Sequence, residues 1–185
     1  MKAYWLIYGL LSLSGLLAGC ATLSQEECRR GDWYDIGRRD AYQGYPDGRL
    51  DEHCKACAEY RVSADATAYA QGYQAGLQDF CTPVRGFQYG RQGGYYQNNC
   101  PPTLEPSFLN QYRLGRELHS LDSQLSNIDS EINRLEDKLR HTDDKDKRRR
   151  LRNELDYLYD KSDWLRQRRY YLENSANWQN PYPPL

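Results

Sequence analysis

Residues 114–139, LGRELHSLDSQLSNIDSEINRLEDKL, decide the fold of the C-terminal half of this chain. Apolar residues recur in this stretch at alternating spacings of four and three, and most of the residues between them are charged or polar. That pattern is typical of a long amphipathic helix that packs along one seam against another helix. The seam residues are Leu114, Leu118, Leu121, Leu125, Ile128, Ile132, Leu135 and Leu139.

A second apolar seam follows and is out of phase with the first. Continuing the first seam past Leu139 would place polar residues in the core, so we predict a turn near 140–150 and an antiparallel coiled-coil hairpin. Polar Ser162 and Arg169 occupy two positions of the second seam, whose apolar members are Leu151, Leu155, Leu158, Leu165 and Leu172. The predicted register places Leu139 near Leu151, Leu135 near Leu155, and Leu125 near Leu165. The alternative is one interrupted helix that oligomerises through both seams.

The predicted turn contains residues that suit the start of a helix. Thr142, Asp143 and Asp144 can cap the second helix by accepting hydrogen bonds from its first backbone amides. The segment 145–152, KDKRRRLR, is basic, which would suit an anionic partner. We interpret it instead as the solvated tip of the hairpin, partly neutralised by the neighbouring aspartates.

The N-terminal half has a different composition, because it contains all six cysteines and nearly all the glycines. A weak repeat runs through it: an aromatic residue, then glycine three positions later, then a small residue after four more. Its copies are Tyr34/Gly37/Ala41, Tyr69/Gly72/Gly76 and Phe87/Gly90/Gly94. Small residues four apart share one face of a helix, so we predict three short helices packed closely through glycine faces. The competing interpretation is irregular loops with a turn at residues 45–48.

The N-terminus predicts export and lipid attachment. Lys2 precedes an uncharged run over residues 3–17, which is too short for a stable membrane span but suits a signal peptide. The run ends in Leu17-Ala18-Gly19-Cys20, which is similar to the lipobox at which bacterial lipoproteins are cleaved and acylated. We therefore expect cleavage between Gly19 and Cys20, lipid on the Cys20 thiol, and, because Ala21 rather than Asp follows, an outer-membrane anchor facing the periplasm.

Composition and spacing together define an all-α chain in five parts. Acidic and basic residues nearly balance, so no net field indicates binding to nucleic acid. The expected parts are a signal peptide (1–19), a lipidated tether (20–27), a disulfide-stapled Cys/Gly/Tyr-rich module (28–104), a helical hairpin (105–174) and a flexible tail (175–185).

Five cysteines remain after lipidation, and an oxidising compartment favours disulfides among them. They are Cys28, Cys54, Cys57, Cys81 and Cys100. Two bridges among five cysteines can be arranged in fifteen ways, and at least one thiol is left over. The Cys54-x-x-Cys57 pair lacks the following histidine of a haem motif and the strand–helix context of a thioredoxin motif. Redox or metal chemistry by Cys54, Cys57 and His53 is kept as an alternative.

Other candidate residues carry weaker signals. His53 lies one helical turn before Cys57 and is interpreted as a core residue, while His119 is interpreted as a surface residue on the flank of the coil. Asp32, Asp35 and Asp40 are interpreted as ordinary surface charges. A further alternative is cell-wall glycan binding, since aromatic rings stack on sugars. Its candidate residues are Tyr95, Tyr96, Asn98 and Asn99.

An ordered series of motifs runs from Cys28 to Pro101. It comprises Cys28, Trp33-x-x-x-Gly37-x-x-Asp40-Ala41-x-x-Gly44, His53-x-x-x-Cys57, Tyr69-x-x-Gly72-x-x-x-Gly76-Leu77, Cys81, Gly86-x-x-x-Gly90 and Gly94-x-Tyr96-x-x-x-Cys100-Pro101. Over about residues 28–118 the chain resembles a family of small proteobacterial envelope lipoproteins defined by a domain of unknown function. The resemblance implies no established activity, cofactor or partner.

The family pattern also bears on the cysteines. Four of the five match it, which implies two bridges among Cys28, Cys57, Cys81 and Cys100. Cys54 departs from the pattern and is the candidate free thiol. In similar proteins the hairpin after residue 118 is an extension of the core domain.

These observations predict a non-enzymatic protein without a metal or cofactor. We expect it to attach to the membrane by its N-terminal lipid and to bind an envelope protein, or a second copy of itself, through the hairpin. The polar seam residues Ser162 and Arg169 could leave one end of the hairpin open for such a partner; a fully closed hairpin is the alternative.

Overall fold

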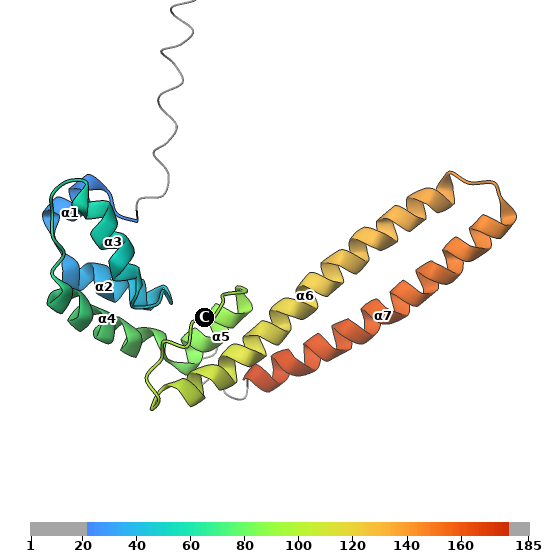
Figure 1. Cartoon of the computed structure of the whole chain (residues 1–185). Coiled ribbons are helices and arrows are strands. Elements are labelled where there is room, and N and C mark those ends of the chain that lie inside the picture. The colour runs from blue at the N-terminus through green and yellow to red at the C-terminus, as the bar shows by residue number, and fades with distance from the viewer. Residues whose placement is uncertain (1–21, 178–185) are drawn as a thin grey trace, which may run out of the picture. The chain divides into compact units, whose positions relative to one another are not determined.

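The computed structural model describes residues 22–177 and, within them, consists of seven α-helices and no strands (Figure 1). The predicted all-α class is therefore confirmed. The helices are α1 (Gln25–Arg30), α2 (Trp33–Tyr42), α3 (Arg49–Ala58), α4 (Ala66–Phe80), α5 (Pro83–Arg91), α6 (Glu105–Arg140) and α7 (Lys145–Asn177). The predicted signal peptide, the lipobox with Cys20, and residues 178–185 of the predicted tail lie outside the described range. No helix in residues 22–177 is both long and apolar enough to cross a bilayer.

The chain forms two compact units, one ending at Gln78 and the other beginning at Asp79. This division falls inside the segment 28–104, which the sequence suggested was one module. The reason is that residues after 79 pack against the start of α6, as described below.

The first unit includes residues that the sequence predicted to be part of the tether. Leu23 is already buried, and Ser24 caps α1 through a reciprocal capping box with Glu27. The backbone amide and hydroxyl of Ser24 both donate to the Glu27 carboxylate, and these bonds hold the pKa of Glu27 below its usual range. Residues 22–27, predicted as tether, thus belong to the folded body.

Helices α2 and α4 cross through glycines in the first unit. A Cβ added at Gly37 would lie under 3.0 Å from the Tyr69 carbonyl oxygen, and one added at Gly72 would meet the Tyr34 carbonyl oxygen equally closely. Real Cβ atoms do not approach this closely, so only glycine permits the observed distance between the two backbones. The predicted close packing through glycine faces is present here.

Helices α5 and α6 form a second crossing of the same kind. A Cβ at Gly90 would collide with the Tyr112 carbonyl oxygen, and one at Gly115 would collide with the Phe87 carbonyl oxygen. The partner of the third repeat copy is therefore Tyr112-x-x-Gly115, which the sequence analysis did not identify. Gly94 was wrongly placed on a helical face: α5 ends at Arg91, and Gly94 lies in the following loop against the Tyr89 ring.

Helices α6 and α7 lie side by side as a hairpin closed by the short turn 141–144 (Figure 1). They share one apolar core, which is continued by partly buried Leu139 and Leu172. Its buried members are Leu121, Leu125, Ile128, Ile132, Leu135, Leu151, Leu155, Leu158 and Leu165. Leu114 and Leu118 are not part of this core, because α6 packs against α5 over that part of its length.

Polar contacts fix the register and the turn of the hairpin. Tyr159 donates to Glu136 at 2.7 Å, Arg166 pairs with Asp129 at 3.6 Å, and Arg169 pairs with Asp122 at 3.3 Å. Across these three pairs the residue number falls on α6 as it rises on α7, as an antiparallel register requires.

The predicted cap of α7 is also present at the turn. The Asp144 carboxylate accepts from the amides of Asp146 and Lys147, and these bonds lower its pKa. From the basic segment, Arg148 donates to the carbonyl oxygens of Leu139 and Thr142. At least this arginine therefore helps to close the hairpin.

The hairpin is closed at its polar seam positions. Ser162 is 1% exposed, and its hydroxyl has no hydrogen-bond partner within the described part of the chain. Arg169 lies at the edge of the seam, where its guanidinium also approaches Glu173 at 3.7 Å. The idea that these residues leave one end of the seam open is not supported by this packing.

Candidate functional site

The most polar part of the protein interior is built around His53 on α3. His53 and Cys57 lie one turn apart and both point into the first unit, while Cys54 between them is exposed. His53 is 1% exposed, in agreement with its predicted core role. Its position brings the imidazole to side chains from α2, α4 and the segment before α1.

Both ring nitrogens of His53 are hydrogen-bonded. Nε2 lies 2.6 Å from Asp40 Oδ2, and Nδ1 lies 2.6 Å from Thr22 Oγ1. The Tyr69 hydroxyl donates to the same Asp40 oxygen at 2.9 Å. Because an ionised carboxylate only accepts, the Nε2 proton belongs to His53, and in the neutral ring Nδ1 accepts from Thr22. We call these four residues the histidine network.

Charge around the histidine network is balanced by Arg49. Its Nε lies 3.7 Å from Asp40 Oδ1, and its guanidinium carbon lies 3.7 Å from the centre of the Tyr45 ring. Burial, followed by the negative charge of Asp40, raises the pKa of Tyr69 far above its usual range. The raised pKa favours the protonated phenol, which donates to Asp40.

The chemistry open to the histidine network follows from this geometry. A hydroxyl, an imidazole and a carboxylate in a row are also the elements of a nucleophile–base–acid triad. The base of such a triad must also exchange a proton with a bound substrate, whereas the His53 ring is 1% exposed and enclosed by the fold. What the contacts do achieve is to join Thr22, near the N-terminus of the folded body, to three helices.

The cysteines form two bridges and leave one thiol. Cys28 of α1 is bonded to Cys57 of α3, and Cys81 is bonded to Cys100. Cys54 is the free, exposed cysteine of the described chain. With Cys57 bonded to Cys28, the Cys54-x-x-Cys57 motif is not a dithiol. In residues 22–177 no group of three or more His, Cys, Asp or Glu side chains is placed to hold a metal ion.

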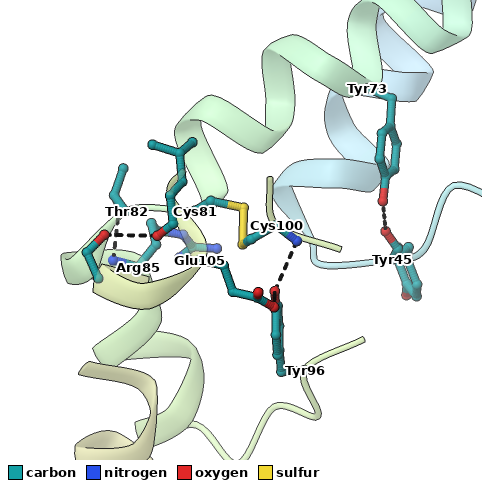
Figure 2. The surroundings of a disulfide bond; sticks show 10 residues. Tyr45, Tyr73, Cys81, Thr82, Arg85, Tyr96, Cys100 and Glu105 are labelled. Atoms are coloured by element: carbon teal, nitrogen blue, oxygen red, sulfur yellow. Dashed lines mark hydrogen bonds between the residues drawn. A yellow bond between two sulfur atoms is a disulfide. The ribbon is translucent and has the colours of Figure 1, made fainter. Parts of the chain in front are cut away.

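The second disulfide lies among hydrogen bonds that fix the loop after α5 (Figure 2). The Tyr96 hydroxyl accepts from the Cys100 amide at 3.0 Å and donates to Glu105 at 2.9 Å. The Tyr96 ring packs against Phe108, at 5.0 Å between ring centres. Of the proposed glycan-stacking residues, Tyr96 is thus part of the core, whereas Tyr95 is 74% exposed.

The other candidate residues were all predicted to lie at the surface, and the structure confirms this for some of them and not for others. Asp32 pairs with Arg30 at the surface, and Asp35 is exposed. Asp40 was wrongly interpreted as a surface charge, since it is 2% exposed inside the histidine network. His119 was also wrongly placed at the surface: it is half-buried, with Nδ1 3.2 Å from the Arg91 carbonyl oxygen.

Sequence reasoning missed Thr22 and Tyr69 as members of the histidine network. Tyr69 is the aromatic residue of the second repeat copy, and Asp40 precedes the small residue of the first. The repeat therefore contained a usable signal, because the crossing that the glycines permit also brings these two side chains together. No local signal singled out Thr22.

Comparisons with known proteins confirm one part of the resemblance noted above, the match to a domain of unknown function. Residues 32–117 match the model of a family described as a protein of unknown function (DUF2799). The match covers α2 to the first part of α6 and includes both glycine crossings. No curated protein and no solved structure matches the chain.

Proposed function

We propose that this chain, which carries a DUF2799 domain over residues 32–117, is a non-enzymatic lipoprotein of the bacterial envelope. It is anchored through lipid on Cys20 in the outer membrane, faces the periplasm, and acts by binding protein through its helical hairpin. The observation that carries the proposal is the position of the folded body. Thr22 lies two residues after the cysteine of a lipobox-like sequence and is bonded to His53 in the interior of the first unit, so lipid on Cys20 would be attached close to the folded module.

The histidine network supports a structural role for the residues nearest the anchor. Thr22 is bonded to His53, and Leu23 is buried beside it. A pull on the anchored end is therefore transmitted directly to α2, α3 and α4. The adjacent Cys28–Cys57 bridge adds a covalent link between α1 and α3. Such bridges persist in oxidising compartments, which agrees with a periplasmic location.

Thiol redox or metal handling is less well supported. It would require Cys54, Cys57 and His53 to act together, but Cys57 is bonded to Cys28 and His53 is held between Thr22 and Asp40. Glycan binding retains one exposed ring, that of Tyr95. Binding to purified cell wall, with Tyr95→Ala as the variant, would revive that alternative if the wild type is retained and the variant is not.

Membrane fractionation of two cysteine variants tests the anchor. Cys20→Ser should move the protein from the membrane fraction to the soluble fraction and abolish incorporation of labelled fatty acid. Cys54→Ser is the matched control, because Cys54 is an exposed cysteine outside the two disulfides, and it should leave both properties unchanged. Membrane retention of Cys20→Ser, or labelling that depends on Cys54, would contradict the proposal.

A further inference from the structure

The tip of the hairpin is strongly basic. Residues 137–152 cover the last turn of α6, the turn 141–144 and the first two turns of α7 (Figure 1). They contain eight lysine or arginine residues and four aspartates, an excess of four positive charges, whereas the whole chain has a net charge of −1. Positive charge is therefore concentrated at this end of the hairpin. We call residues 137–152 the basic tip.

Three of the four aspartates of the basic tip already have partners within it. Asp137 pairs with Arg140 at 3.1 Å, and Asp146 pairs with Arg149 at 3.2 Å. The Asp144 carboxylate accepts from two backbone amides and caps α7. These contacts leave most of the lysines and arginines of the basic tip without a carboxylate partner.

Four cations at the start of α7 are exposed, and their side chains form no ion pair or hydrogen bond within the described chain. They are Lys145, Lys147, Arg150 and Arg152. Asp144 lies near two of them: its pKa is lowered first by its bond from the Lys147 amide and, less strongly, by the nearby charges of Arg150 and Lys147. One carboxylate does not balance four cations, so the group keeps a net positive charge.

The stability of α7 does not explain the position of these cations. Lys145 and Lys147 lie in the first turn of the helix, where the helix dipole favours negative charge and disfavours positive charge. At about 100° per residue, Lys145 and Arg152 lie on one flank of α7, and Lys147 and Arg150 lie on the other. The positive charge is therefore directed at solvent on both sides of the helix, where a partner can reach it.

The surface of the basic tip suits an anionic membrane better than a protein. Its two leucines, Leu139 and Leu151, pack in the hairpin core, so it has no exposed aromatic or aliphatic side chain to act as the anchor of a protein interface. Phosphate headgroups require no such anchor, because each lysine or arginine close to an anionic membrane is attracted by charge alone. A fluid lipid surface also adapts to cations on two flanks of a helix.

From these charges we infer that the basic tip binds membranes that contain anionic phospholipid, through the phosphate headgroups. This role goes beyond the protein binding proposed for the hairpin, because it gives the tip a partner of another class. The choice of phospholipid over nucleic acid, which also presents phosphates, rests on the envelope location proposed above. Binding should weaken as salt is added, because a shorter Debye length screens exposed charges.

Partition of the mature chain onto vesicles tests this binding. The chain from residue 20 onward with Cys20→Ser carries no lipid of its own, so any binding comes from the folded protein. It should bind vesicles of equal parts phosphatidylglycerol and phosphatidylcholine at least about tenfold more tightly than vesicles of phosphatidylcholine alone. Raising the salt from about 50 to about 500 mM should remove most of this difference. Equal binding to the two kinds of vesicle would overturn the inference.

Two quadruple variants with the same change in net charge separate the basic tip from the rest of the surface. The first combines Lys145→Gln, Lys147→Gln, Arg150→Gln and Arg152→Gln, and should lose at least about tenfold in binding to the anionic vesicles. The matched control replaces two lysines and two arginines outside the basic tip that are also exposed and form no ion pair within the described chain. It combines Arg29→Gln, Lys55→Gln, Arg113→Gln and Lys161→Gln.

The control variant should bind the anionic vesicles within about twofold of the parent chain, since its cations lie away from the basic tip. An equal loss in both variants would overturn the inference, because binding would then follow net charge alone. Because all eight positions are exposed, helicity by circular dichroism should match the parent in both.

The remaining outcomes distinguish this role from its alternatives. Binding of the parent chain to a DNA duplex without binding to the anionic vesicles would show the wrong class of partner and would also overturn the inference. Fatty-acid labelling of the native protein on Cys20 without vesicle binding would refute this inference alone. Vesicle binding without such labelling would refute the proposed anchor alone.

Discussion

Asp40 is the residue on which the interior of the first unit depends. Its carboxylate is buried and accepts from both His53 and Tyr69, with Arg49 nearby. Removing an acceptor from two buried donors costs more than the net value of the bonds, because the donors cannot return to water. The Ser162 hydroxyl is buried without a hydrogen-bond partner in the described chain. It has lost its hydrogen bonds to water without replacement, so removing it should increase the free energy of unfolding.

We expect Asp40→Ala to reduce the free energy of unfolding by about 2–4 kcal/mol, because two buried donors lose their acceptor. Asp35→Ala is the control: it lies on the same helix and is exposed, and it should change stability by less than about 0.5 kcal/mol. Urea unfolding followed by circular dichroism measures both. Equal effects of the two variants would show that the histidine network contributes nothing specific.

The raised pKa of Tyr69 gives a pH dependence with a definite sign. In the unfolded chain a tyrosine ionises near pH 10, whereas folded Tyr69 keeps its proton. Above about pH 10 the unfolded state therefore gains stability that the folded state does not, and the free energy of unfolding falls. Tyr69→Phe should show a shallower fall between pH 9 and 11 than the wild type. Parallel curves would contradict this assignment.

Ser162→Ala should stabilise the hairpin. The Ser162 hydroxyl is buried with no partner in the described chain, so its removal avoids a desolvation cost of about 1 kcal/mol. Ser130→Ala controls for helix propensity, since Ser130 is exposed and bonded to the Ser126 carbonyl. Thermal unfolding should show a higher midpoint for Ser162→Ala than for Ser130→Ala; the reverse order would be inconsistent with an unsatisfied hydroxyl.

At the scale of helices, the chain uses two different packing devices. The two glycine crossings bring backbones into contact, and the hairpin instead packs leucines along a seam. A glycine crossing requires positions without a side chain, so no larger residue is tolerated there. The second depends on apolar area and tolerates exchange between apolar residues of similar volume.

Gly72→Ala should therefore destabilise the first unit by about 2–3 kcal/mol or prevent its folding, since the new Cβ would collide with the Tyr34 carbonyl. Gly48→Ala is the matched substitution: nothing lies within 4 Å of a Cβ there, and its φ of −59° suits alanine. It should be neutral or stabilising by about 0.4–1 kcal/mol. Hydrogen exchange of α2 and α4 would report both effects, and similar exchange in the two variants would exclude the crossing as the cause.

Sequence patterns predicted the elements better than their partners. The leucine spacing predicted α6 and α7 and their turn, and the glycine repeat predicted the helices α2, α4 and α5. Neither pattern indicated that α5 packs against α6, because that contact depends on Gly115, which lies between two residues of the leucine seam and was not recognised as part of the glycine repeat. Asp40 was missed for a related reason: its partner His53 lies thirteen residues away on another helix, and local periodicity does not report such pairs.

At the scale of the whole molecule, each compact unit has one disulfide and one glycine crossing. The bridges close loops with sequence separations of 29 and 19 residues, and such loops typically contribute about 3–4 kcal/mol each. Each unit therefore has its own covalent cross-link. The first unit contains Thr22, two residues from the proposed anchor, and the second contains the hairpin.

The claim that joins these features is that lipid on Cys20 holds the folded body against a membrane. The most direct test is the mass of the N-terminal peptide of the mature protein, isolated from cells and reduced before digestion. The account predicts a peptide that begins at Cys20 and carries the added mass of a diacylglycerol group, with or without a further acyl chain. A peptide that begins at Met1, or an unmodified Cys20 in the mature chain, would contradict it.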